Sequence, residues 1–158
     1  MIDGLITVAA LSPGLRVADP SFNGKEIVAG IEEAAKQGVC LLVLPELCTT
    51  GSTCGDLFHS QTLLKASDDA VRKIVGSTTS LQLIVVFGAP VVLGSNLYNA
   101  SIVAYGGQIL AVAPKHAGGV FASYEGEPLT VELFDAYLFR QRYSHRTACD
   151  SPFRSCNR

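Results

Sequence analysis

The chain has 158 residues, of which 48% are apolar and 16% are charged, and its formal net charge is -2. A chain of this length can bury about 70% of its unfolded surface, so we expect one globular domain with a real core and exclude a disordered protein. With 12 basic and 14 acidic residues, the chain lacks the cationic surface that nucleic-acid binding requires.

The sequence also bears on membranes and on redox state. No uninterrupted apolar run approaches the roughly 18 residues of a membrane span, and Asp3 stands where a signal peptide carries positive charge. We therefore expect a cytoplasmic protein. The cysteines, at positions 40, 48, 54, 149 and 156, are odd in number and unevenly spaced, which favours free thiols over a disulfide framework.

The first part of the chain alternates short apolar runs with amphipathic stretches, which predicts strands interleaved with helices. The apolar runs 4–11 and 39–44 predict two strands that are buried on both faces. Between them lies an amphipathic helix that Asn23 would cap and Gly38 would end. A strand, a helix and a strand in this order form a unit with parallel pairing.

The pattern continues with two short helices predicted over 57–65 and 68–75, the second capped by Ser67. Residues 82–89 predict a third buried strand. Three further apolar runs, separated by glycine-containing turns, predict antiparallel strands up to residue 113.

The composition changes after Lys115, because residues 116–158 contain no Lys and five Arg. We therefore divide the chain into a domain over 1–115 and a divergent or partly disordered tail over 116–158. Within this tail, the pattern of residues 129–142 predicts one helix.

Two charged residues directly follow apolar strands, each after a proline. Glu46 follows VCLLVLP, and Lys115 follows QILAVAP. Ligands of parallel α/β sheets gather at such strand ends, where desolvation would raise the pKa of Glu46 toward the range of a general base. Lys115 would stabilise a developing oxyanion. From these residues alone, a salt bridge or two solvated charges are the alternative.

Several segments around this pair follow one another in a characteristic order: VADP (17–20), PELCTTG (45–51), TCGDLFHSQTLL (53–64), VVFGAPVV (85–92), LYNASIV (97–103) and GGQILAVAPK (106–115). They resemble the carbon-nitrogen hydrolase, or nitrilase, superfamily. In particular, they are similar to the amino-terminal glutaminase domain of bacterial glutamine-dependent NAD synthetases, over about residues 5–115.

This resemblance implies an α/β fold, a nitrilase-like αββα sandwich of two face-to-face sheets that is incomplete in this chain, and a homo-oligomer. It also implies a Glu-Lys-Cys triad, in which Glu46 takes the proton of a cysteine whose thiolate attacks the side-chain amide of glutamine. Lys115 then steadies the oxyanion. The ammonia would pass to an ATP-dependent NAD synthetase domain or chain. We therefore expect no cofactor here, because ATP would belong to that absent domain.

The sequence departs from the family pattern after Lys115. Cys149 is the candidate nucleophile because Asp150 follows it, and the family cysteine typically stands beside acidic residues. No apolar strand precedes Cys149, however. Glu125 or Glu127 is the candidate for a second glutamate that would support the lysine, and Glu125 is the candidate contact to the substrate.

The other cysteines have structural interpretations. Cys40 lies in a predicted strand, so we expect it in the core. Cys48, Cys54 and His59 have spacings that match no strong zinc pattern, so we expect no metal site.

Two alternatives remain open. One is a truncated, non-catalytic remnant or interaction module, which would expose a sheet edge and apolar surface unless a partner covers it. The other is a small-amide or nitrile hydrolase of the same superfamily.

Overall fold

The computed structural model of this protein describes residues 5–115 and 121–122. The candidate residues Glu125, Glu127 and Cys149 and the helix predicted over 129–142 lie outside the described residues. The elements in chain order are β1 (Val8–Ala10), α1 (Pro20–Lys36), β2 (Leu41–Val43), the 3-10 helix η1 (Gly55–His59), α2 (Gln61–Ser77), β3 (Ile84–Leu93), β4 (Asn96–Tyr105) and β5 (Gln108–Pro114).

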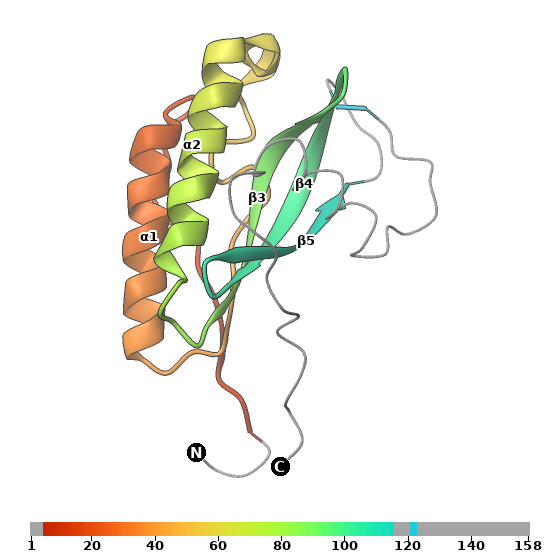
Figure 1. The fold of residues 1–158 in the computed structure, drawn as a ribbon. Coiled ribbons are helices and arrows are strands. Elements are labelled where there is room, and N and C mark those ends of the chain that lie inside the picture. The colour runs from red at the N-terminus through yellow and green to blue at the C-terminus, as the bar shows by residue number, and fades with distance from the viewer. Residues whose placement is uncertain (1–4, 116–120, 123–158) are drawn as a thin grey trace.

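The described strands form one mixed sheet in the order β1-β2-β3-β4-β5. β1, β2 and β3 pair in parallel, and β3, β4 and β5 pair as an antiparallel meander. The parallel pairs are joined by α1 and by α2, as the alternation of strand and helix patterns predicted. The two helices lie side by side against one face of the sheet (Figure 1).

The core lies between the two helices and the sheet. Ile27 and Ile31 on α1, Ile74 on α2, and Val85 and Phe87 on β3 are completely buried in one apolar cluster. The α1 residues are spaced by one helical turn, so they lie on one stripe of that helix. The predicted α/β fold is confirmed.

Helix α1 begins earlier than predicted. The Asp19 side chain accepts a hydrogen bond from the Phe22 backbone N–H (3.0 Å), and Pro20 occupies the first turn. Proline suits this position because its fixed φ is helical and the missing N–H has no partner there in any case. Asn23, the predicted cap, instead lies inside the helix and is completely buried.

A single helix, α2, replaces most of the two predicted short helices, and η1 precedes it. Ser67, the predicted cap between them, lies inside α2 and is completely buried. Its hydroxyl is 2.9 Å from Thr49 Oγ1. This tertiary hydrogen bond satisfies Ser67, so the residue does not end the helix.

The prediction that the first two strands are buried on both faces is wrong. β1 is an edge strand, and its Val8 is 59% exposed. On β2, Leu42 is buried against the helices, whereas Val43 points to the other face and is 41% exposed. Among the described residues the helices cover one face of the sheet, so alternate strand residues remain accessible.

The antiparallel strands predicted after residue 89 are confirmed, although β3 is one continuous strand that runs through Pro90. Its hairpin with β4 turns at Gly94, and the β4–β5 hairpin turns at Gly106 and Gly107, all with positive φ. Because β3 and β4 are longer than β2, their hairpin extends beyond the point where β2 ends.

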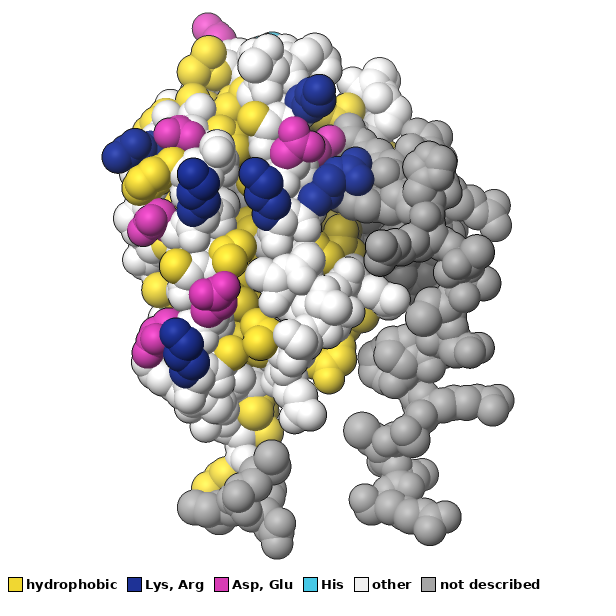
Figure 2. All heavy atoms as spheres, turned by 60° about the vertical axis from the view of Figure 1, so that its left-hand side comes forward, with side chains coloured by type: hydrophobic (Ala, Val, Ile, Leu, Met, Phe, Trp, Pro, Cys, Tyr) yellow, Lys and Arg dark blue, Asp and Glu magenta, His cyan; other side chains and the backbone are white. Residues whose placement is uncertain are grey.

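The helix-covered side of the molecule carries both signs of charge. Lys and Arg side chains are interspersed with Asp and Glu side chains over this surface (Figure 2). Within the described part of the chain, no helix is long and apolar enough to cross a membrane.

Candidate active site

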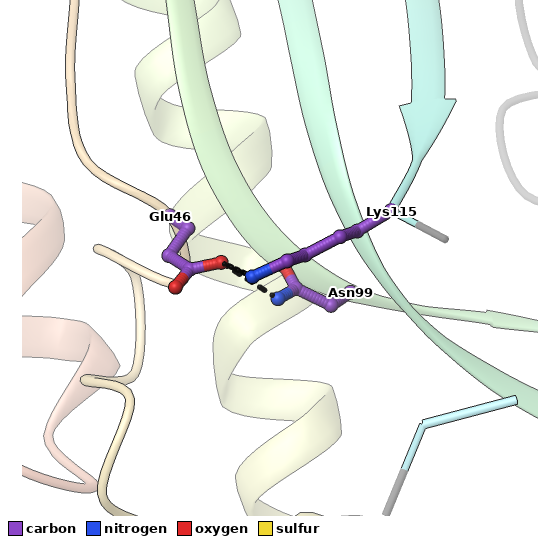
Figure 3. Close-up of polar contacts among 3 residues, drawn as sticks. All are labelled: Glu46, Asn99 and Lys115. Atoms are coloured by element: carbon purple, nitrogen blue, oxygen red, sulfur yellow. Dashed lines mark hydrogen bonds and ion pairs between the residues drawn. The ribbon is translucent and has the colours of Figure 1, made fainter. Parts of the chain in front are cut away.

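Glu46 and Lys115 meet at one edge of the sheet. β2 is parallel to β3, and β5 runs in the same direction because both β3 and β5 are antiparallel to β4. The residues that follow β2 and β5 therefore lie at the same edge. Lys115 Nζ donates to Glu46 Oε2 at 2.6 Å (Figure 3). Both side chains are about half exposed.

Asn99 on β4 is a third member of this site that the sequence reasoning missed. Its Nδ2 donates to Glu46 Oε2 at 3.2 Å (Figure 3). Its backbone carbonyl accepts the Lys115 backbone N–H at 2.7 Å. The sequence signal that could have identified Asn99 is its amide side chain in the middle of the apolar run LYNASIV. A buried polar side chain in a strand requires a hydrogen-bond partner.

The pKa of Glu46 is lowered, which is opposite to the direction expected from its position. The hydrogen bond from the Lys115 ammonium is the largest cause, and the hydrogen bond from Asn99 adds to it. Burial acts in the raising direction, but its effect is smaller because the Glu46 side chain is about half exposed. Glu46 is therefore ionised at neutral pH.

A close backbone approach fixes the position of Glu46. The Gly88 N–H on β3 donates to the Pro45 carbonyl at 3.2 Å. A Cβ on Gly88 would lie 2.5 Å from Glu46 Cα and would also clash with the backbone N of Leu47. Only glycine lets β3 pass this close to the turn that carries Glu46.

A buried polar cluster also holds this loop, residues 45–51. Asn23 Nδ2 donates to the carbonyls of Arg16 (2.8 Å) and Thr49 (3.1 Å), and its Oδ1 accepts the Arg16 N–H (2.7 Å). Thr49 also contacts Ser67 on α2 through its hydroxyl. Asn23, Thr49 and Ser67 are all completely buried. Because Asn23 belongs to α1 and Ser67 to α2, both helices bind the buried side of the loop.

The model of the carbon-nitrogen hydrolase family matches residues 5–127. The chain belongs to the carbon-nitrogen hydrolase family.

Among curated members, the chain is similar to glutamine-dependent NAD(+) synthetases. It is 31% identical over 112 residues to that of Mycobacterium leprae, which covers 71% of this chain and 16% of the relative. The protein of Arabidopsis thaliana is 26% identical over 137 residues, which cover 87% of this chain and 18% of the relative. The chain thus spans about a sixth of the length of these relatives.

Solved structures show the same likeness. A glutamine-dependent NAD(+) synthetase from Cytophaga hutchinsonii superposes with a TM-score of 0.70 at 26% identity, over 75% of this chain and 22% of that one. An amidase from Nesterenkonia sp. superposes with a TM-score of 0.63 at 21% identity, over 78% of this chain and 50% of that one, which shows the shared fold. The chain carries a nitrilase-superfamily domain similar to that of glutamine-dependent NAD synthetases.

The three described cysteines do not supply this carbon-nitrogen hydrolase domain with a nucleophile at Glu46. Cys48 is completely buried, its Sγ donates to the Gly88 carbonyl at 3.4 Å, and burial raises the pKa of its thiol to about 11. Cys54 is buried and donates to the Thr50 carbonyl at 3.2 Å. Cys40 is only partly buried, so the prediction that it lies in the core is wrong, whereas Cys48 and Cys54 are core residues. A thiolate nucleophile requires a more polar and accessible position.

Cys48 and Cys54 lie in different apolar clusters. Cys48 belongs to the main core, whereas Cys54 belongs to a separate small cluster with Leu47 and Phe58. Across residues 5–115 and 121–122, no group of three or more His, Cys, Asp and Glu side chains is placed to hold a metal ion. Cys149 and Glu125, outside the described residues, stay predictions.

Proposed function

We propose that this chain contributes Glu46 and Lys115 to an enzyme that hydrolyses the side-chain amide of glutamine, as the ammonia-supplying domain of a glutamine-dependent NAD synthetase. The observation that carries the proposal is the Lys115–Glu46 contact of 2.6 Å at the carboxyl edge of the sheet. The similarity to proteins named glutamine-dependent NAD(+) synthetases supports the choice of amide.

In the proposed reaction, the ionised Glu46 takes the proton of a cysteine thiol, for which Cys149 is the predicted residue. The thiolate attacks the amide carbon, and the Lys115 ammonium stabilises the oxyanion that forms. The carbon–nitrogen bond then breaks, ammonia leaves with the returned proton, and water hydrolyses the thioester to glutamate. The predicted second glutamate, Glu125, would support the lysine.

The contact between the two charges is suited to this sequence of steps. While Lys115 donates to Glu46, the carboxylate is a weak base, because its pKa is lowered. Once Lys115 also donates to a developing oxyanion, its hydrogen bond to the carboxylate weakens, and the carboxylate becomes more basic. The same ammonium group therefore assists both proton transfer and oxyanion formation.

The released ammonia would serve an ATP-dependent synthetase domain or chain, to which ATP would also bind. No cofactor is proposed for this chain. The cytoplasmic location and the homo-oligomer stay predictions.

A non-catalytic role is the second candidate. One observation favours it: the hydrogen bonds of the described cysteines go to backbone carbonyls and not to Glu46. In that case the ion pair would stabilise the edge of the sheet and would have no part in chemistry.

Ammonia release from glutamine by the purified chain tests the proposal. We expect release by the wild type, loss in Glu46→Gln and Lys115→Met, and loss in Cys149→Ala. The matched control is Glu33→Gln, which removes a carboxylate from a solvent-exposed pair with Lys36 on α1 and should retain activity.

Two other results would change the conclusion. Absence of ammonia release from a well-folded chain would refute the hydrolase and favour the non-catalytic role. Faster turnover of simple aliphatic amides than of glutamine, with the same dependence on Glu46, would replace the glutaminase with a small-amide hydrolase.

A further inference from the structure

Asn99 contacts both charged members of the site from one position on β4. Its side-chain Nδ2 donates to Glu46 Oε2, and its backbone carbonyl accepts the Lys115 N–H. Glu46 follows β2 and Lys115 follows β5, and the sheet order places β3 and β4 between these strands. Asn99 therefore links two chain segments that no direct strand pairing connects.

The two oxygens of the Glu46 carboxylate have different surroundings. Lys115 Nζ and Asn99 Nδ2 both donate to Oε2 (Figure 3). Within residues 5–115 and 121–122, no side chain or backbone group donates to Oε1. A carboxylate oxygen has about two lone-pair directions, so the two donors occupy Oε2, and within the described part of the chain Oε1 has no donor and can accept a proton.

The Asn99 amide is itself well fixed. The residue is only 8% exposed, and its backbone is held in β4 between Pro90 on β3 and the end of β5. Glu46 is the partner of its side-chain amide among the described residues. Since a buried amide without a partner is unfavourable, this side chain has a strong preference for one orientation, toward Glu46.

We propose that Asn99 is a positioning residue that separates the tasks of the two Glu46 oxygens: together with Lys115 it fixes Oε2, and Oε1 is the atom that accepts the proton of the nucleophile. The proton transfer rests on the proposed function. The tether between Asn99 and Glu46 does not depend on it and is measurable in a chain without activity.

An NMR titration of the Glu46 side-chain carboxyl carbon tests the tether directly, with Glu46→Gln to assign the signal. Lys115 is the charged group that faces Glu46 among the described residues. Asn99→Ala removes one donor to the ionised form, so the midpoint should move to higher pH, and Asn99→Asp should move it further. Asn96→Ala, which removes an exposed amide from the same strand, should leave it unchanged. An unchanged midpoint in folded Asn99→Ala would overturn the proposal.

A second measurement needs no change at Asn99. In the wild type, the side-chain N–H resonances of Asn99 should shift with the same midpoint as the Glu46 carboxyl, and this shift should disappear in Glu46→Gln. Side-chain resonances of Asn99 that stay constant while Glu46 titrates would contradict the tether, even if Asn99→Ala did not fold.

Kinetics separate this proposal from the proposed function. For ammonia release, Asn99→Ala should lower kcat by about tenfold or more with little change in KM for glutamine, since misplacement of a reacting group slows the reaction. Failure of the glutaminase assay with an intact titration result refutes the hydrolase and leaves the tether. Unchanged kcat in folded Asn99→Ala refutes the positioning role and leaves the hydrolase.

Discussion

The loop that follows β2, residues 45–51, has an upper side and an underside of opposite character. On the upper side, Glu46 forms an ion pair with Lys115 in which both side chains are about half exposed. On the underside, Cys48, Thr49 and Thr50 are completely buried. The carboxyl group of Glu46 thus has a lowered pKa, whereas the thiol of Cys48, two positions further along the chain, has a raised pKa.

This difference shows what fixes the site in place. An ion pair in contact with water stabilises a protein by about 0–1 kcal/mol, which is too little to hold a loop in one conformation. Buried hydrogen bonds and close backbone contacts on the underside have larger effects. Substitutions on the underside should therefore lower the free energy of unfolding, whereas substitutions on the upper side should lower the rate of the reaction.

Gly88→Ala should have the largest effect on stability. Gly88 lies where the backbone of β3 meets the backbone of the loop 45–51. The new Cβ would clash with the main chain of Glu46 and Leu47, and main-chain atoms cannot rotate away as a side chain does. We expect a loss of about 3 kcal/mol in the free energy of unfolding, measured by urea denaturation.

Gly76→Ala is the matched control for this substitution. Gly76 lies near the end of α2, where an added Cβ would meet no described atom within 4 Å apart from its own helix. Alanine there should leave stability unchanged or raise it by about 0.5 kcal/mol. A similar loss in both variants would mean that the tight approach at Gly88 has no special importance for the loop.

Asn23→Ala should be the next most destabilising change. It removes the partner of three backbone groups, at Arg16 and Thr49, and at least the Thr49 carbonyl is buried. Each buried group without a partner costs about 1–3 kcal/mol, so we expect a loss of about 2 kcal/mol by urea denaturation. Gln37→Ala, which removes an exposed hydrogen bond to Glu33, should change stability by less than about 0.5 kcal/mol. Equal effects of the two would contradict the difference between the sides of the loop.

The sequence predicted the α/β fold, the parallel pairing of the first strands and the later antiparallel hairpins, because apolar periodicity and glycine turns are local signals. It also placed Glu46 and Lys115 directly after strands, where ligands of α/β sheets gather. That the two act together was implied only by the resemblance to the carbon-nitrogen hydrolase superfamily.

The errors came from residues whose tertiary partners decide their role. Asn23 and Ser67 are residue types that often cap helices, yet both lie inside helices and bind the Glu46 loop. The pKa of Glu46 was expected to rise, because a strand end suggested desolvation, whereas its ammonium and amide donors lower it. Asn99 was missed because its contact with Glu46 spans 53 residues of sequence.

The upper side of the loop should respond least in stability and most clearly in its pH dependence. Glu46→Gln and Lys115→Met should each lower the free energy of unfolding at pH 7 by less than about 1 kcal/mol, because the pair is half exposed. Added salt should reduce this difference further, since it screens accessible charges.

The sign of the pH dependence follows from the lowered pKa of Glu46. The folded state binds the Glu46 proton less tightly than the unfolded state does, so the stabilisation is fully present above the unfolded carboxyl pKa of about 4.3. It is lost as the pH falls through the lower pKa of the folded state. The difference between wild type and Glu46→Gln should therefore shrink steadily below about pH 4.3. A difference that stays constant down to acid unfolding would show that the glutamine variant changes the loop itself, and the upper side would then be as structural as the underside.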